Sequence, residues 1–249
     1  MKNILFIAPH PDDEIVGAAF IIKKILKKKN VFIFFPTNGL ISREKMWPWE
    51  RYGYQRRLKL RLKEMKRSVK ALNIRKLYLQ NLPSRTLKDN ISKTYIKIKK
   101  IIKSDKIDTI FCPAYEGGHQ DHDVSNFICS RLKKVSSIYE YPEYNFSNRK
   151  VNSNSFVHNT KNQKNVYLTA NEKKIKAQLL AIYASEKKNL NYLSFTKESY
   201  RKIIDYDYSS PPHSGKLFYR RFSFFSWHPR VDSDTPRTVS EKIINSKIF

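Results

Sequence analysis

Residues 1–20 read MKNILFIAPHPDDEIVGAAF, and the fold class that we expect for the chain follows first from this stretch. Its apolar run, Ile4 to Ala8, is typical of a strand that is buried on both faces of a parallel sheet. Residues Asp12 to about Lys29 then predict a helix, and VFIFFPT at Val31 to Thr37 predicts a second buried strand. A strand, a helix and a strand in this order indicate a βαβ unit with a right-handed crossover.

The same alternation of patterns continues along the chain. We expect further strands at 76–82, 109–114, 137–144 and 165–169, and helices at 56–72, 91–103, 121–134 and 171–187. The sequence therefore predicts an α/β fold: a single doubly wound, Rossmann-like, mostly parallel sheet flanked by helices. We expect one domain over residues 1–249, with a core at about 1–190 and an irregular C-terminal region at about 191–249 that closes the pocket.

Composition limits the class of protein. The 249 residues include 49 Lys and Arg against 22 Asp and Glu, a net charge of +27. Such a surface favours anionic partners, but a general lysine bias explains it more simply, and we expect no specific nucleic-acid partner. The two cysteines, Cys112 and Cys129, form no CxxC motif, which indicates a reducing cytoplasm. No run approaches the roughly 18 apolar residues of a membrane span, so at most peripheral membrane contact is expected, and the oligomeric state stays open.

Polar clusters follow two of the predicted strands. One is His10-Pro11-Asp12-Asp13-Glu14, and the other is Gly117-Gly118-His119-Gln120-Asp121-His122-Asp123. In open parallel sheets, ligand sites form at the carboxyl ends of the strands. The first cluster alone also suits a helix N-terminus, where proline and acids are common. The second cluster favours a metal site, because two histidines three residues apart can face one centre, and histidine and carboxylate are zinc ligands.

Together the two clusters resemble the motifs of the PIG-L/LmbE-like zinc-dependent de-N-acetylases. Enzymes of that family carry a (P/A)HPDDE motif after the first strand and an HxDH motif after a later one. The resemblance is strongest over residues 1–125, and it is specific because both motifs occur in this order and context. It implies hydrolysis of an N-acetyl group.

The resemblance also implies a role for each motif residue. Three side chains would hold Zn²⁺ or another divalent metal ion: His10, Asp13 and His122. Asp12 would be the general base for the attacking water. His119 would act electrostatically or as a proton donor at the tetrahedral intermediate, and Asp121 would orient a histidine. The position two before His119 is Gly117, so no tyrosine is assigned to the intermediate.

The chemistry of these residue types agrees with that assignment. A bound zinc ion lowers the pKa of water toward about 7 and polarises an amide carbonyl. A carboxylate beside it takes the proton of the water, and the departing amine needs an acid, for which His119 is the candidate. Adjacent Asp12 and Asp13 can divide the work, because neighbouring side chains in a turn point in different directions. Glu14 suits either a helix cap or a partner of the metal ligands.

Two further residues are predicted to contact a substrate at the rim of the pocket. Arg43 follows the second strand in a loop with Trp47 and Trp49, and His213 stands in the rigid turn Pro211 to Gly215. Aromatic rings in such a loop either stack on a sugar or pack within the protein. His158 and His228 show no partner in the sequence and are expected to be incidental.

These patterns favour an enzyme: a zinc-dependent hydrolase that removes the N-acetyl group from an N-acetylglucosamine-like sugar in a larger glycoconjugate. The positive charge mildly favours an anionic carrier for that sugar. One alternative is a zinc amidase that acts on another amide, such as a thiol-sugar conjugate. A second, from a different class, is a basic polyanion-binding protein with a vestigial metal site, against which the complete set of ligands and base argues.

Overall fold

A seven-stranded sheet forms the centre of the computed structural model, which describes residues 2–26, 29–190, 193–194, 196–220, 228–231 and 234–248. The strand order is β3-β2-β1-β4-β5-β9-β8. The strands are β1 (Asn3–Ile7), β2 (Asn30–Ile41), β3 (Lys76–Ser84), β4 (Ile107–Pro113), β5 (Ser137–Tyr141), β8 (Lys164–Tyr167) and β9 (Lys197–Lys202). The first five strands in this order are parallel, and β9 is antiparallel to both of its neighbours. The predicted fold class is confirmed.

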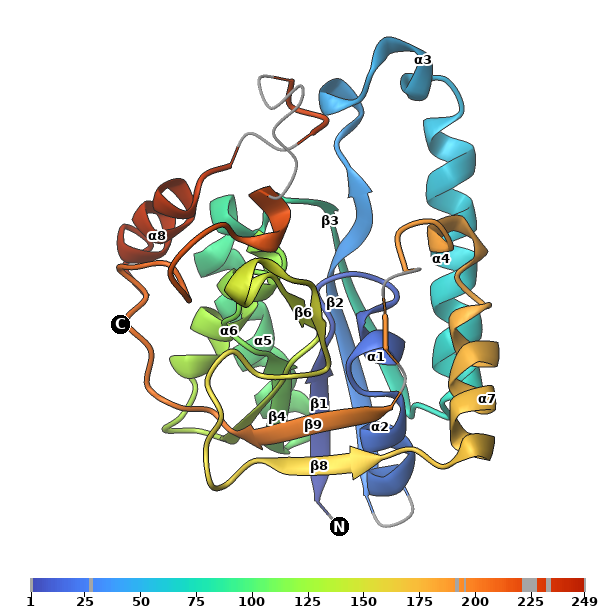
Figure 1. Cartoon of the computed structure of the whole chain (residues 1–249), viewed down its shortest axis with the longest axis vertical. Coiled ribbons are helices and arrows are strands. Elements are labelled where there is room, and N and C mark those ends of the chain that lie inside the picture. The colour runs from blue at the N-terminus through green and yellow to red at the C-terminus, as the bar shows by residue number, and fades with distance from the viewer. Residues whose placement is uncertain are drawn as a thin grey trace.

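Helices cover both faces of the sheet (Figure 1). One face carries α1 (Asp13–Val16), α2 (Ala19–Leu26), α4 (Tyr54–Ala71) and α7 (Ala170–Leu180). The other carries α5 (Ile91–Asp105), α6 (Gln120–Ser130) and α8 (Pro236–Ile244). The smaller elements are α3 (Pro48–Arg51), η1 (Arg43–Lys45), η2 (Leu87–Asp89), η3 (Ser147–Arg149), η4 (Ala184–Glu186), η5 (Phe218–Arg220) and the hairpin of β6 (Tyr144–Asn145) and β7 (Asn152–Ser153). No helix in the described part of the chain is both long and apolar enough to cross a membrane.

The apolar run of β1 is explained by its two buried faces. Ile4 and Phe6 pack into the core beneath α1, α2, α4 and α7, whereas Leu5 and Ile7 pack into the core beneath α5 and α6. Successive side chains of a strand point to opposite faces, so a central strand needs apolar residues at every position.

The sequence predicted one helix from Asp12 to about Lys29, and this prediction is wrong. The segment forms two helices, α1 and α2, with a break at Gly17 and Ala18; residues 27–28 lie outside the described residues. A Cβ at Gly17 would lie only 2.5 Å from the ring of Tyr141, so the break lies where the chain packs against the last residue of β5.

The C-terminal region is more regular than predicted, because it contains β9 and α8. The sequence of β9, KESYRK, has no apolar periodicity, yet Glu198 and Arg201 are buried. Glu198 bonds to Lys176 Nζ at 2.7 Å, and Arg201 Nε bonds to Glu140 Oε1 at 2.7 Å. Buried charges are tolerated when they are paired. Because β9 is buried through paired charges, it lacks the apolar pattern from which a strand is predicted.

Candidate active site

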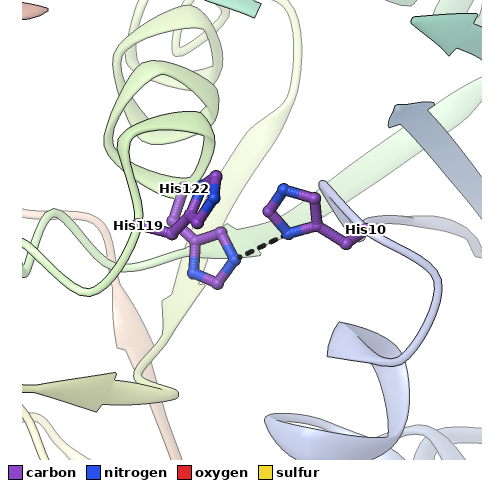
Figure 2. A group of neighbouring side chains, drawn as sticks. All are labelled: His10, His119 and His122. Carbon is purple, nitrogen blue, oxygen red and sulfur yellow. Dashed lines mark hydrogen bonds between the residues drawn. The ribbon is translucent and has the colours of Figure 1, made fainter. Parts of the chain in front are cut away.

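The two predicted polar clusters meet between the carboxyl ends of β1 and β4. These neighbouring strands lie where the strand order reverses, with β2 and β3 to one side and β5 to the other. Ligand sites in open α/β sheets form at this kind of switch point. His10 follows β1, while His119 and His122 lie at the start of α6, and the three rings point toward one another from these two elements (Figure 2).

Three donor atoms form an equilateral triangle at this point. His10 Nδ1 and His122 Nε2 each lie 3.2 Å from Asp13 Oδ2, and they lie 3.2 Å from each other. Zinc binds nitrogen and oxygen ligands at about 2.0–2.2 Å, which puts two ligands of a tetrahedral site roughly 3.3 Å apart. The triangle therefore has the dimensions of one face of such a site, and its donors fit a divalent ion of this size.

The electrostatics of the triangle favour a cation. Burial alone would lower the pKa of His10, but the carboxylates of Asp13 and Asp121 raise it to about 10. Burial alone would raise the pKa of Asp13, but His122 and His10 hold it well below its usual range. An acid that stays ionised while fully surrounded by protein is a strong attractor of positive charge.

Asp121 sets the orientation of the His10 ring. Its Oδ2 accepts hydrogen bonds from His10 Nε2 at 3.0 Å and from the main-chain N–H of Arg85 at 2.6 Å, and its Oδ1 accepts one from the N–H of Leu87 at 3.2 Å. Burial would raise the pKa of Asp121, but the bond from His10 and its other partners hold it far below its usual range. Because Asp121 occupies Nε2, the other ring nitrogen of His10 faces the triangle.

Asp12 stands outside the triangle although Asp13 belongs to it. The backbone of Asp12 has φ of 130°, a region that residues other than glycine rarely adopt, and its carboxylate bonds to Arg61 with Nη2 2.9 Å from Oδ2. Such a conformation costs on the order of 1–3 kcal/mol and persists only where neighbours enforce it. Burial raises the pKa of Asp12 to about 8, against the opposing charge of Arg61. Asp12 is thus able to take up a proton at the edge of the triangle.

Glu14 supports this strained turn. Its Oε2 accepts the main-chain N–H of Asp12, the N-cap residue of α1, at 3.0 Å. Its Oε1 accepts the hydroxyl of Tyr183 at 2.6 Å and that of Ser68. Glu14 is completely buried, and its bonds connect the turn to α4 and to the segment after α7. Its role is therefore larger than the helix cap that the sequence suggested.

His119 belongs to the same cluster of histidines as His10 and His122. It is the N-cap residue of α6, and its Nδ1 accepts the N–H of Asp121 at 3.1 Å. A neutral ring with Nδ1 as acceptor carries its proton on Nε2. Burial and the neighbouring His10 lower the pKa of His119 well below its usual value, so the ring is neutral in this environment. Its centroid lies 4.3 Å from that of His10.

A cavity of about 850 Å³ opens onto the triangle, and its size is within the range of small-molecule sites. Parts of η5 and of the segment 228–231 line it beside the N-terminal elements. Its described cationic lining residues are Arg57, Arg61, Arg85, Lys188 and Arg230. Its described acidic lining residues are Asp12, Asp13, Glu50 and Glu186.

The two residues predicted at the rim do not line this cavity. Arg43 is exposed on η1, and His213 is half-buried with Nδ1 2.8 Å from the carbonyl oxygen of Ser214. Their contact with a substrate stays a prediction. Trp47 does line the cavity, and its ring stacks with that of Trp49, with centroids 5.2 Å apart, and with that of His228, with centroids 3.4 Å apart.

The histidines expected to have no partner both have one. His228 stacks on Trp47, and His158 Nε2 lies 3.4 Å from the carbonyl oxygen of Pro212. Neither contact was visible in the sequence, because each joins segments that are distant along the chain.

Two residues of the site were missed from the sequence, Arg61 and Glu143. Arg61 belongs to the helix predicted at 56–72, and only 2% of its surface is exposed. It lies three residues after Leu58 and four before Met65, so the helical period already placed it on the buried face. Glu143 falls inside the strand predicted at 137–144, whereas β5 ends at Tyr141, so the sequence did not place Glu143 at the carboxyl end of a strand.

Comparison with known proteins agrees with the motifs. A family model described as PIG-L, GlcNAc-PI de-N-acetylase, matches residues 5–133, which include both clusters. A search of curated proteins finds no match.

Three solved structures illustrate the fold that this chain shares. A deacetylase of the teicoplanin biosynthesis pathway is 14% identical with a TM-score of 0.64, over 83% of this chain and 99% of its own. The N,N'-diacetylchitobiose deacetylase of Pyrococcus horikoshii is 18% identical with a TM-score of 0.58, over 91% of this chain and 88% of its own. The 4-carboxy-2-hydroxymuconate hydratase GalB of Pseudomonas putida is 12% identical with a TM-score of 0.53, over 83% of this chain and 98% of its own. At these identities the similarity shows the fold, and one fold carries both deacetylases and a hydratase, so the reaction has to be argued from the site.

Proposed function

Because the chain belongs to the PIG-L family of de-N-acetylases, we propose that it is a zinc-dependent hydrolase that removes the N-acetyl group from an amino sugar. The observation that carries this proposal is the triangle of His10, Asp13 and His122 with Asp12 beside it but outside it. A metal-dependent hydrolase needs a set of metal ligands and a separate base. Here the adjacent residues of one turn supply both, with Asp13 among the ligands and Asp12 as the base.

The residues of the triangle would hold the ion, and the others would move protons. A zinc ion in such a site polarises an amide carbonyl and lowers the pKa of water. Asp12 would accept the proton of the attacking water, and Arg61 holds its carboxylate at the edge of the cavity. His119, whose Nε2 carries the proton of the neutral ring, would hydrogen-bond to the developing oxyanion or donate to the departing amine. The products are acetate and a free amine.

The polar cavity supports a sugar conjugate as the substrate. Its volume of about 850 Å³ exceeds the need of an acetyl group alone, and carboxylate and guanidinium groups both line it. Mixed charged groups suit the hydroxyls of a sugar. Arg57, Arg85 and Arg230 also add positive charge to the lining of the cavity, which favours an anionic group on the carrier of that sugar. One of the two deacetylases of similar fold is named for N,N'-diacetylchitobiose, an N-acetylated sugar, which supports the same class.

The proposal is tested by incubating the zinc-loaded protein with free, nucleotide-linked and lipid-linked N-acetylhexosamines and measuring released acetate. Acetate from one linkage type identifies the substrate class. Release of a different acid from a panel of other N-acyl amides would instead identify the other-amide alternative. Arg237→Ala is a matched control, since Arg237 is exposed on α8 and lies outside the cavity, and it should retain activity if the assay reports on this site. No hydrolysis of any amide, together with strongly salt-dependent nucleic-acid binding, would favour the polyanion-binding alternative.

A further inference from the structure

Glu143 is a buried acid that the proposed reaction does not use. It lies in the turn between β5 and β6, none of its surface is exposed, and no N–H or hydroxyl group in the described part of the chain bonds to its carboxyl oxygens. Burial and the neighbouring carboxylate of Asp13 raise the pKa of Glu143 well above its usual range. The Nδ1 atom of His122 is likewise buried without a partner, and it lies 3.9 Å from Glu143 Oε1. An unpaired buried polar group costs about 1–3 kcal/mol, so two that face each other require an explanation.

We propose that Glu143 is the positioning residue that holds His122 in the tautomer and orientation needed for metal binding. When Nε2 of His122 uses its lone pair as a ligand, the proton of the neutral ring is on Nδ1. That buried N–H needs an acceptor, and Glu143 Oε1 is the carboxylate oxygen that faces it. A displacement of about 1 Å would bring the two atoms to hydrogen-bond distance. This inference rests on the proposed metal site.

The arrangement repeats on His122 what Asp121 does on His10. Asp121 accepts from the Nε2 atom of His10 and leaves Nδ1 at the triangle, whereas Glu143 faces Nδ1 of His122 and leaves Nε2 there. Each histidine of the triangle thus has its own carboxylate on the side away from the ion. Ligating histidines commonly have such a partner, and its loss typically weakens metal binding about 10–100-fold.

The surrounding structure keeps space for this carboxylate and fixes its backbone. The N–H of Glu143 donates to Glu116 Oε1 at 2.6 Å, and its carbonyl oxygen accepts from the N–H of Asn154 at 2.9 Å. A Cβ at Gly17 would lie 2.8 Å from Cγ of Glu143, although φ of Gly17 is an ordinary −92°. The missing side chain at Gly17, rather than its backbone freedom, is what allows Glu143 to occupy this position.

The experiment measures zinc affinity and the stability of the metal-free protein separately. The variants are Glu143→Met, which has a similar size and no acceptor, and Glu143→Gln, which keeps an acceptor oxygen. Tyr141→Phe is the matched control, because it removes a buried hydroxyl two residues away that donates to the carbonyl oxygen of Ile7 and not to the site. Zinc dissociation constants come from competition with a chromophoric chelator, and thermal unfolding of each metal-free variant is followed by circular dichroism.

We expect Glu143→Met to weaken zinc binding about 10–100-fold, Glu143→Gln to weaken it less than about tenfold, and Tyr141→Phe to leave it within about twofold. The metal-free Glu143→Met protein should unfold at the wild-type temperature or above it, because an unpartnered buried carboxylate is removed. Wild-type zinc affinity in Glu143→Met, or a loss of affinity matched by a lower unfolding temperature without metal, would overturn the inference. Zinc affinity is measured without substrate, so a failure to release acetate would refute the proposed function and leave this inference standing.

Discussion

The guanidinium group of Arg61 is bonded to the carboxylate of Asp12, with Nη2 2.9 Å from Oδ2, and its Nη1 lies 3.3 Å from Glu186 Oε1. Arg61 comes from α4 and is buried, so one helix far from the motif in sequence fixes the acid that the triangle leaves free. The position of Asp12 therefore depends on the packing of α4 against the sheet as well as on the turn that carries it.

Replacement of Arg61 tests this dependence. Arg61→Met should lower kcat/KM for acetate release by about 10²-fold or more, because Asp12 loses the partner that holds its carboxylate at the cavity. It should also destabilise the protein by about 3–5 kcal/mol, since a buried ion pair loses one member. Zinc stoichiometry should stay unchanged, because Arg61 touches no atom of the triangle. Loss of zinc with the arginine would contradict this division of roles.

The loop before His119 leaves no space for a side chain at Gly118. A Cβ at Gly118 would lie 2.2 Å from the main-chain oxygen of Tyr144, so Gly118→Ala must shift the backbone that carries His119. We expect a stability loss of about 1–3 kcal/mol, measured by urea unfolding, and a loss of acetate release.

Gly215→Ala is the comparison for this prediction. Gly215 has φ of +87°, but its added Cβ would meet nothing within 4 Å. The free energy of unfolding of Gly215→Ala should fall by only roughly 1–2 kcal/mol, which is the cost of a left-handed backbone for a residue with a Cβ, and the variant should keep its activity. Equal loss of activity in both variants would show that volume at Gly118 is not the cause.

Loss of one member of the buried ion pair between Lys176 and β9 should have a strong effect on the stability of the protein. Lys176 Nζ donates to Glu198 Oε1 at 2.7 Å and to the carbonyl oxygen of Val16 at 2.8 Å, and both charged residues are fully buried. Lys176→Met should destabilise the protein by about 3–5 kcal/mol, because Glu198 keeps a buried charge without its partner. The double variant Lys176→Met with Glu198→Gln should recover part of this loss in urea unfolding. A fully additive pair of losses would argue against direct coupling.

Stability should also depend on pH through Glu116. Burial raises the pKa of Glu116 to about 8, although three donors bond to its carboxylate. The folded state therefore holds this proton more tightly than the unfolded state, so the contribution of Glu116 to stability is present at pH 4 and is lost as pH rises toward about 8. Glu116→Gln should flatten the fall in unfolding free energy between pH 5 and pH 8. An unchanged slope in the variant would mean that other groups carry the dependence.

The periodicity of apolar residues and the spacing of the two motifs were enough to predict the parallel part of the sheet and the two loops that form the triangle. Both depend on contacts that are local in sequence or common to all parallel sheets. The features that could not be predicted depend on ion pairs between residues that are distant in the sequence. The charged residues of β9 can be buried because Lys176 and Glu140 pair with them. Arg61 can be buried because it pairs with Asp12 and Glu186. A single side chain read alone does not reveal its partner, and buried charge is only stable with one.

The most direct test of the account compares zinc content and acetate release in Asp12→Asn and His122→Ala. We expect Asp12→Asn to keep one zinc per chain while acetate release falls about 10²–10⁴-fold, because the base is separate from the ligands. We expect His122→Ala to lose zinc and activity together, because one corner of the triangle is missing. Stoichiometric loss of zinc from Asp12→Asn, or a wild-type protein that binds no divalent metal and is not activated by zinc, would contradict this assignment of ligands and base.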